Sequence, residues 1–212
     1  MSDKDKIKLC LFDCGGVIYP YSLTPFNDFV LKLSKKETPL RFKWRELMAG
    51  KISFDTFCQD VCTQIGCEYT QERRLQMDEK LHQGVGSFYA ETLKSISYLK
   101  AKGVKVGILS NALPCLTDTV KNIGIDEEFI FPSYKIGLLK PDTTVFKIVQ
   151  EKTGLSFQEM LFIDDKVENV KAAEKMGIKS LVFDLKTVCN KIKTVCGERD
   201  AGYISHWRCY CR

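Results

Sequence analysis

The chain has 212 residues, of which 44% are hydrophobic and 28% charged, and its formal net charge is +5. This balance is typical of a globular protein, and no apolar run approaches the ~20 residues that a membrane-spanning helix needs. The basic residues are interspersed with acidic ones, which argues against nucleic acid as a partner and leaves small anionic substrates as the compatible class.

The N-terminal residues 1–8 are polar and lead directly into a predicted strand, without the apolar core of a signal peptide. Ten cysteines are present, most of them scattered through the body of the chain. Without an export signal, such cysteines are expected to be reduced and mostly buried. The sequence therefore predicts a cytoplasmic protein without a membrane partner.

Five short apolar segments predict buried β-strands, each followed by polar or turn residues. They are residues 7–12, 104–109, 128–131, 160–163 and 180–183. Helical patterns lie between the later strands, at residues 90–102, 144–153 and 167–176. This alternation predicts an α/β fold with a doubly wound parallel sheet, in which ligands bind beyond the carboxyl ends of the strands.

Residues 21–88 interrupt the alternation, because they contain only helical patterns. The expected helices are residues 26–35, 42–49, 54–65 and 71–81. An insertion between the first and second strands is expected to form a small helical cap over the strand ends. The predicted organisation is a core of residues 1–20 and 89–185, a cap of residues 21–88 and a C-terminal tail of residues 186–212.

Polar residues with catalytic potential follow four of the predicted strands. They are Asp13, Ser110, Asn111, Lys140, Asp164 and Asp165. One aspartate after a strand is usually only a turn residue or helix cap, but a polar element after each of four strands indicates a shared site. Carboxylates that converge there repel one another unless a cation lies among them, and oxygen ligands favour Mg²⁺.

A phosphoryl-transfer site fits the same residue types. An aspartate with an ordinary pKa near ~4 is ionised at neutral pH and can act as a nucleophile without a base to activate it. A phosphoryl group needs cationic and hydrogen-bond donor partners, which Lys140, the Ser110 hydroxyl and the Asn111 backbone amide could supply. Gly15 and Gly16 would let the backbone approach the phosphate closely.

Four segments resemble the sequence motifs of the haloacid dehalogenase-like hydrolases: residues 12–18, 108–112, 137–142 and 162–169. The resemblance covers residues 6–184 and implies a Rossmann-like core with a type-1 helical cap. Within the cap, residues 49–55 are similar to a turn and helix of one subfamily. That subfamily includes small sugar-phosphate phosphatases, among them glucose-1-phosphate phosphatases, and a similar cap occurs in the phosphatase domains of bifunctional epoxide hydrolases.

The resemblance implies a Mg²⁺-dependent phosphatase for small phosphomonoesters, such as sugar phosphates, that acts through an aspartyl-phosphate on Asp13. Its small phosphorylated substrate is the implied partner, and oligomeric state has no signal in the sequence. The implied metal ligands are Asp13, the carbonyl of Gly15, Asp164 and Asp165, supported by Asn169. The implied catalytic and phosphate-binding residues are Asp13, Ser110, Asn111, Lys140 and Gly16.

Position 15 departs from the usual pattern of the phosphatases. They carry there a second aspartate, which protonates the leaving alkoxide, whereas this chain has Gly15. Two alternatives stay open: a metal-independent 2-haloacid dehalogenase-like hydrolase, since dehalogenases also lack this aspartate, and a catalytically inactive binding module. The pair Asp164–Asp165 favours a metal and hence a phosphatase.

Other groups have plainer interpretations. Cys14 is expected to be buried with its side chain directed away from that of Asp13. The tail holds Cys189, Cys196, His206, Cys209 and Cys211, whose spacing is not that of a structural zinc site. In the cap, the side chains considered as substrate contacts are Trp44, Arg45 and Lys51.

Overall fold

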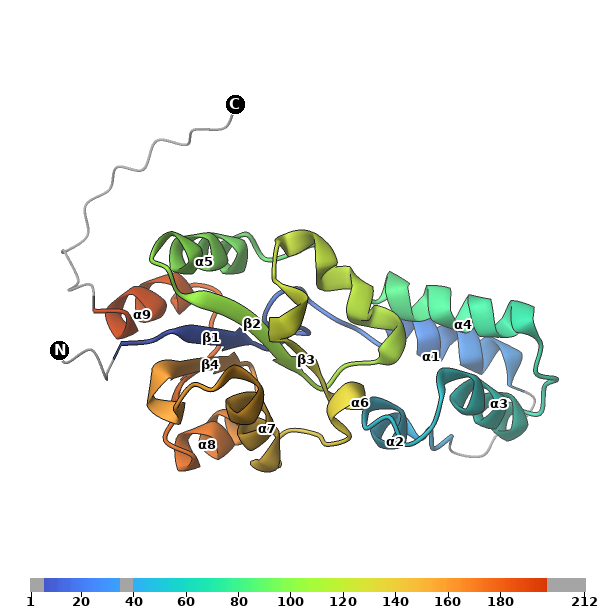
Figure 1. Ribbon diagram of the computed structural model, residues 1–212. Coiled ribbons are helices and arrows are strands. Elements are labelled where there is room, and N and C mark those ends of the chain that lie inside the picture. The colour runs from blue at the N-terminus through green and yellow to red at the C-terminus, as the bar shows by residue number, and fades with distance from the viewer. Residues whose placement is uncertain (1–5, 35–39, 198–212) are drawn as a thin grey trace.

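The protein is built on a five-stranded, all-parallel sheet with the order β3-β2-β1-β4-β5 (Figure 1). The computed structural model describes residues 6–34 and 40–197. The strands are β1 (Leu9–Phe12), β2 (Lys105–Ser110), β3 (Ile130–Pro132), β4 (Met160–Asp164) and β5 (Lys179–Val182). The predicted α/β fold with a parallel sheet is therefore confirmed, and each of the five apolar segments supplies one strand.

Helices cover both faces of the sheet, which is why the central strands are apolar throughout. All four residues of β1 and all five residues of β4 are buried. Figure 1 shows α5 (Ala90–Ala101) and α9 (Val188–Val195) on one face, and α7 (Thr144–Thr153) and α8 (Val167–Lys175) on the other. Burial on both faces is the usual state of a parallel sheet and leaves its carboxyl edge as the place for polar groups.

The segment between β1 and β2 is helical, as predicted. It contains α1 (Thr24–Leu33), α2 (Trp44–Met48), α3 (Phe54–Ile65) and α4 (Gln71–Gln83), which we call the helical insertion. Ser53 caps α3 by accepting a hydrogen bond from the Thr56 backbone N–H, and Gly66 ends that helix at φ 75°. The insertion has its own apolar cluster, which includes Phe26, Phe57 and Met77.

Two chain segments connect the helical insertion to the sheet, and they lie side by side. Tyr21 and Val85 form an isolated antiparallel bridge. On either side of it, the Ser22 N–H donates to the Gly84 carbonyl and the Gly86 N–H to the Pro20 carbonyl, both at 2.9 Å. Because the two segments pair, the chain leaves the sheet domain and returns to it at one place.

The structure adds elements that the sequence patterns did not reveal. They are the 3₁₀ segments η2 (Pro114–Ile123), η3 (Glu127–Phe129) and η4 (Phe157–Glu159), the short helix α6 (Ser133–Ile136) and α9. Helix α9 (Val188–Val195) lies within the segment expected to be a tail, residues 186–212. It packs on the core, because Val188 and Ile192, four residues apart, are buried against the sheet domain.

The cysteine group of the tail is only partly within the described residues. Cys189 and Cys196 are described, whereas His206, Cys209 and Cys211 lie outside the described residues. Within residues 6–34 and 40–197, no helix is long and apolar enough to cross a bilayer.

Candidate active site

Asp13 lies directly beyond β1, between the ends of two neighbouring strands. Phe12 pairs with Ile108 of β2 on one side and with Ile163 of β4 on the other. The Asp13 backbone N–H donates to the Ile163 carbonyl at 2.9 Å, and only 7% of the residue is exposed. The parallel register thus places this carboxylate at the centre of the carboxyl edge of the sheet.

Lys140 lies between two of the predicted carboxylates. Its Nζ is 3.0 Å from Asp13 Oδ1 and 2.5 Å from Asp164 Oδ2, and the lysine is buried. Burial alone would lower the pKa of Lys140, but the negative charges of Asp13 and Asp164 outweigh it and raise the pKa above its usual value. The ammonium group is therefore charged at neutral pH.

The end of β2 holds the lysine loop in place. The Asn111 side chain donates from Nδ2 to the Lys140 carbonyl and accepts from the Lys140 backbone N–H, both at 2.9 Å. Lys140 Nζ also donates to the Leu109 carbonyl at 2.7 Å. Asn111 therefore uses its side chain to position Lys140, a role that its place in the sequence did not reveal.

Asp164 and Asp165 are adjacent in the sequence but have opposite surroundings. Asp164 is fully buried, and its oxygens accept hydrogen bonds from Lys140, from the Lys166 backbone N–H and from Asn169 Nδ2 at 2.5 to 3.0 Å. Asp165 is exposed. Its pKa is raised, first by partial desolvation and then by the charges of Asp13 and Asp164. Asp164 therefore has its acceptor sites occupied, while the Asp165 carboxylate is accessible to solvent.

The arrangement fits a divalent cation. Asp13, Asp164 and Asp165 each offer a carboxylate oxygen, and these oxygens lie within 4.8 Å of one another. Asp13 Oδ1 is buried and, although paired in charge with Lys140, it accepts no hydrogen bond in the described structure. Three carboxylates against one lysine leave an excess of negative charge, and hard oxygen donors suit Mg²⁺.

Gly16 makes the approach of Asp165 possible. Its φ is +85°, and a Cβ atom at this position would lie 2.6 Å from Asp165 Oδ2. A side chain here would therefore face both backbone strain and a collision with the carboxylate. Glycine at position 16 was predicted to let the backbone approach a phosphate. In the structure it also leaves room for the Asp165 carboxylate.

The remaining predicted residues lie around this centre. Ser110 ends β2 and is 5% exposed, and Gly15 follows Asp13 in the turn after β1. Cys14 is buried, as predicted, and the pKa of its thiol is raised to about 12 by burial and by the charge of Asp13. The thiol is therefore protonated at neutral pH, which supports the expectation that it takes no part in the chemistry.

Ser133 is a site-supporting residue that the sequence analysis missed. Its hydroxyl donates to the Met48 carbonyl of the helical insertion at 2.6 Å and accepts from the Ala112 backbone N–H at 3.0 Å. It therefore ties the insertion to the loop that follows Ser110. The available signal was its position two residues after the predicted strand 128–131, at the same edge of the sheet as Asp13 and Ser110.

Known proteins resemble this chain along most of its length. The family description of the haloacid dehalogenase-like hydrolases matches residues 7–177. An (S)-2-haloacid dehalogenase of Pseudomonas fluorescens is 25% identical over 196 residues, which cover 81% of this chain and 82% of the dehalogenase. The sesquiterpene phosphatase astK of Aspergillus oryzae is 26% identical over 197 residues, which cover 90% of this chain and 97% of the phosphatase.

A solved structure has the same fold. It is a HAD family enzyme of Bacteroides thetaiotaomicron in complex with magnesium and inorganic phosphate. The TM-score is 0.69 at 21% identity, and the match covers 92% of this chain and 98% of that chain. Together with the match to the family description over residues 7–177, this shows that the chain belongs to the haloacid dehalogenase-like hydrolases, a family of enzymes.

Proposed function

We propose that the protein is a Mg²⁺-dependent phosphatase that hydrolyses small phosphomonoesters through an aspartyl-phosphate on Asp13. The observation that carries this proposal is the surplus of carboxylates around Lys140, because such a cluster needs a cation. The similarity to a sesquiterpene phosphatase supports phosphate as the group transferred, and the similar fold of an enzyme crystallised with magnesium and phosphate agrees with it.

The covalent step assigns the nucleophile to Asp13. A carboxylate oxygen of Asp13 attacks phosphorus, and the bond between phosphorus and the ester oxygen breaks. Water then attacks phosphorus, which releases inorganic phosphate and restores the carboxylate. Lys140 pairs in charge with Asp13, and with Ser110, Asn111 and Gly16 it would hold the phosphoryl group.

The proposed metal ligands are Asp13, Asp165 and the Gly15 carbonyl. Asp164, whose oxygens already accept hydrogen bonds from Lys140 and Asn169, would act through water and by positioning Lys140. The chemistry that Mg²⁺ supplies when bound is neutralisation of the charge on the phosphoryl oxygens. In this proposal Asn169 supports the metal site by fixing Asp164.

Protonation of the leaving group is assigned to water. Gly15 has no side chain to act as the acid, and a positioned acid typically contributes ~10²–10⁴-fold in rate. We therefore expect phosphate esters with acidic leaving groups to react faster than alkyl phosphates. The helical insertion would serve as the cap of the core, with the predicted bounds of core and cap, while α9 at the start of the predicted tail packs on the core.

The proposed location is the cytoplasm. Within the described residues, seven cysteines are free thiols, which suits a reducing compartment: Cys10, Cys14, Cys58, Cys62, Cys67, Cys115 and Cys189. The proposed partner is the small phosphorylated substrate, with no nucleic acid and no membrane.

A substrate panel tests the proposed reaction. The purified protein is incubated with phosphomonoesters and with 2-haloacids, in Mg²⁺ or in EDTA, beside Asp13→Asn and the matched control Asp126→Asn, whose aspartate is exposed. We expect Mg²⁺-dependent phosphate release that falls at least about 10⁴-fold in Asp13→Asn and is unchanged in the control. Halide release in EDTA would instead identify a dehalogenase, and a folded protein without turnover on either panel would identify a binding module.

A further inference from the structure

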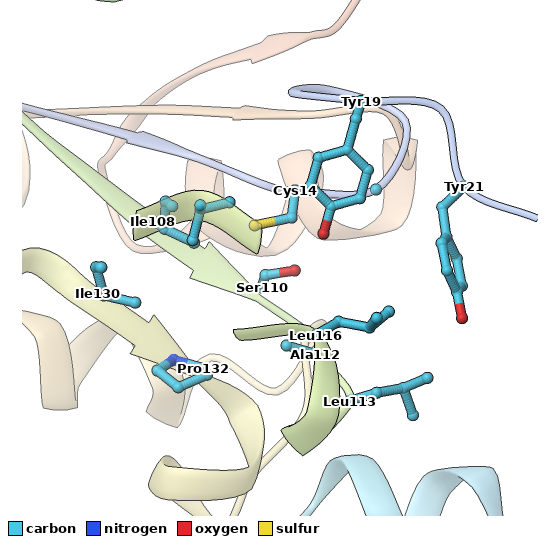
Figure 2. A pocket seen from close by; sticks show the side chains of 12 residues that line it. Cys14, Tyr19, Tyr21, Ile108, Ser110, Ala112, Leu113, Leu116, Ile130 and Pro132 are labelled. Carbon is cyan, nitrogen blue, oxygen red and sulfur yellow. The ribbon is translucent and has the colours of Figure 1, made fainter. Parts of the chain in front are cut away.

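A small cavity opens beside the proposed active site. It encloses about 60 Å³, and its walls include Gly15 and Ser110 as well as Tyr21, Leu113 and Leu116. Figure 2 shows the Ser110 hydroxyl pointing into the space that the labelled side chains surround. Since one water molecule needs only about 10–15 Å³ of such space, the cavity is large enough for a small branched alkyl group.

The cavity wall is apolar and carries no charge. None of the described residues that line it is acidic or basic. Tyr19, Tyr21 and Ser110 place hydroxyl groups in the wall, but the other lining side chains are apolar. A polyhydroxylated sugar placed here would therefore lose more hydrogen bonds to water than the wall could replace.

The apolar wall continues into the helical insertion. Leu113 and Leu116 are 5% and 7% exposed, and both belong to the same apolar cluster as Phe26 and Phe57 of the insertion. The cavity therefore lies where the apolar cluster of the insertion reaches the catalytic edge of the sheet.

Gly15 connects the cavity to the reacting groups. A Cβ atom at this position would lie 3.3 Å from Tyr21 Cβ, so the aromatic side chain occupies the place toward which a side chain at position 15 would extend. A leaving group beside Gly15 would therefore meet a tyrosine ring and apolar side chains.

A second hollow has the opposite character and lies elsewhere. It encloses about 360 Å³ between α2 and the loop 137–142, and Arg45, Glu46, Lys51 and Asp142 are among its lining residues. Neither Asp13, Ser110 nor Gly15 contributes to it. The polar hollow would suit a sugar, but it does not share a wall with the proposed nucleophile or with Ser110.

We propose that the cavity beside Gly15 and Ser110 receives the first carbon atoms of the leaving alcohol, so that the preferred substrates are phosphate monoesters of apolar alcohols. This inference rests on the proposed phosphatase function and names its substrate class. In an in-line displacement the leaving oxygen lies opposite the nucleophile, and the phosphoryl group held at Ser110 then directs the alcohol toward the adjoining cavity.

Matched substrates test the inference. With the Mg²⁺-loaded protein, kcat/KM is measured for 3-methylbutyl phosphate, n-propyl phosphate and glycerol 3-phosphate, the last two having equal carbon chains. We expect kcat/KM to be at least about 10-fold higher for 3-methylbutyl phosphate than for glycerol 3-phosphate, with n-propyl phosphate between them. Equal values, or a preference for glycerol 3-phosphate, would overturn the inference.

Acetyl phosphate separates this inference from the proposed function, because it presents no alcohol chain. Mg²⁺-dependent hydrolysis of acetyl phosphate that is lost in Asp13→Asn supports the phosphatase. The same result without any preference among the three esters overturns only the apolar-alcohol inference. Absence of hydrolysis of acetyl phosphate and of all three esters overturns the proposed function and, with it, the inference that rests on it.

Two substitutions at Leu116 change the cavity in opposite directions. Leu116→Phe narrows it and should lower the ratio of kcat/KM for 3-methylbutyl over n-propyl phosphate at least about 10-fold, whereas Leu116→Ala should favour longer chains. Leu75→Phe, at a residue of α4 that is 60% exposed, is the matched control and should leave the ratio unchanged. A folded Leu116→Phe variant with an unchanged ratio contradicts the proposed place of the alcohol.

Discussion

Two neighbouring regions at the carboxyl edge of the sheet treat polar groups in opposite ways. Around Lys140, each oxygen of the buried Asp164 accepts hydrogen bonds, and the ammonium group contacts two carboxylates. In the cavity beside Gly15, the buried Tyr21 hydroxyl has no hydrogen-bond partner in the described structure. The charged cluster is thus organised by directed contacts, while the cavity is defined by shape and apolar surface.

The difference indicates how the two halves of a substrate would be recognised. Fixed charges and donors can stabilise a phosphoryl group whose charge distribution changes during the reaction. An apolar cavity selects mainly by volume and by excluding groups that need hydrogen bonds. The electrostatic region would therefore be required for any phosphate ester, whereas the cavity would discriminate among alcohols.

The largest effect is expected from Lys140→Met. The substitution leaves Asp13 and Asp164 buried without their cation, and breaking a buried ion pair in this way typically costs about 3–5 kcal/mol in the free energy of unfolding. Urea denaturation at neutral pH measures it. Lys147→Met, at an exposed lysine, should stay within about 0.5 kcal/mol of the parent. A Lys140→Met protein as stable as the parent would mean that the cluster is not held together by this charge.

A smaller effect is expected from Gly16→Ala. The added methyl group would lie 2.6 Å from Asp165 Oδ2 and should displace that carboxylate. We expect Mg²⁺ affinity, measured by titration calorimetry, to fall about 10–100-fold, as when other supports of a metal site are lost. Gly154 is the matched control, because its φ is also positive, at +68°, but open space surrounds it. Gly154→Ala should therefore change stability and leave Mg²⁺ affinity unaltered. Equal Mg²⁺ affinity in both variants would exclude Asp165 as a ligand.

The smallest effect is expected from Tyr21→Phe, which addresses the apolar region. The Tyr21 hydroxyl is buried without a hydrogen-bond partner in the described structure. Its removal should therefore lower the free energy of unfolding by less than about 0.5 kcal/mol, or raise it. Tyr69→Phe is the matched control, since the Tyr69 hydroxyl donates to Asp55 Oδ1 at 2.8 Å, and it should lower the free energy of unfolding. Thermal or urea unfolding compares the two. A greater loss in Tyr21→Phe than in Tyr69→Phe would show that the cavity wall is polar after all.

Much of the fold could be predicted from local patterns. The five strands and the helices of the sheet domain and the insertion have apolar periodicity and end signals, such as Ser53 and Gly66 around α3, that act within a few residues. Helix α9 was missed because only Val188 and Ile192 are fully buried in it, a pattern too short to stand out from a polar segment. The 3₁₀ segment η2 was missed although Pro114 opens it and Gly124 ends it in the left-handed conformation, and its Val120 and Leu116 pack in the two apolar clusters.

The sequence by itself determined which residues meet at the edge of the sheet. A polar residue at the end of a buried parallel strand must lie at the carboxyl edge, so Asp13, Ser110 and Asp164 come together once β1 pairs with β2 and β4. The order of these residues along the chain, and the presence of glycines beside Asp13, can be read from the sequence without the tertiary structure.

Only the tertiary structure decided which of those residues are buried and hydrogen-bonded and which are exposed to solvent. It buries Asp164 among hydrogen-bond donors and leaves Asp165 exposed to solvent, although the two residues are neighbours in the chain. It also brings Leu116 of η2 and Tyr21 of the connecting segment into the wall of the cavity beside Gly15. Hydrogen-bond satisfaction and cavity shape depend on residues far apart in the chain, and no local pattern records where those residues will meet.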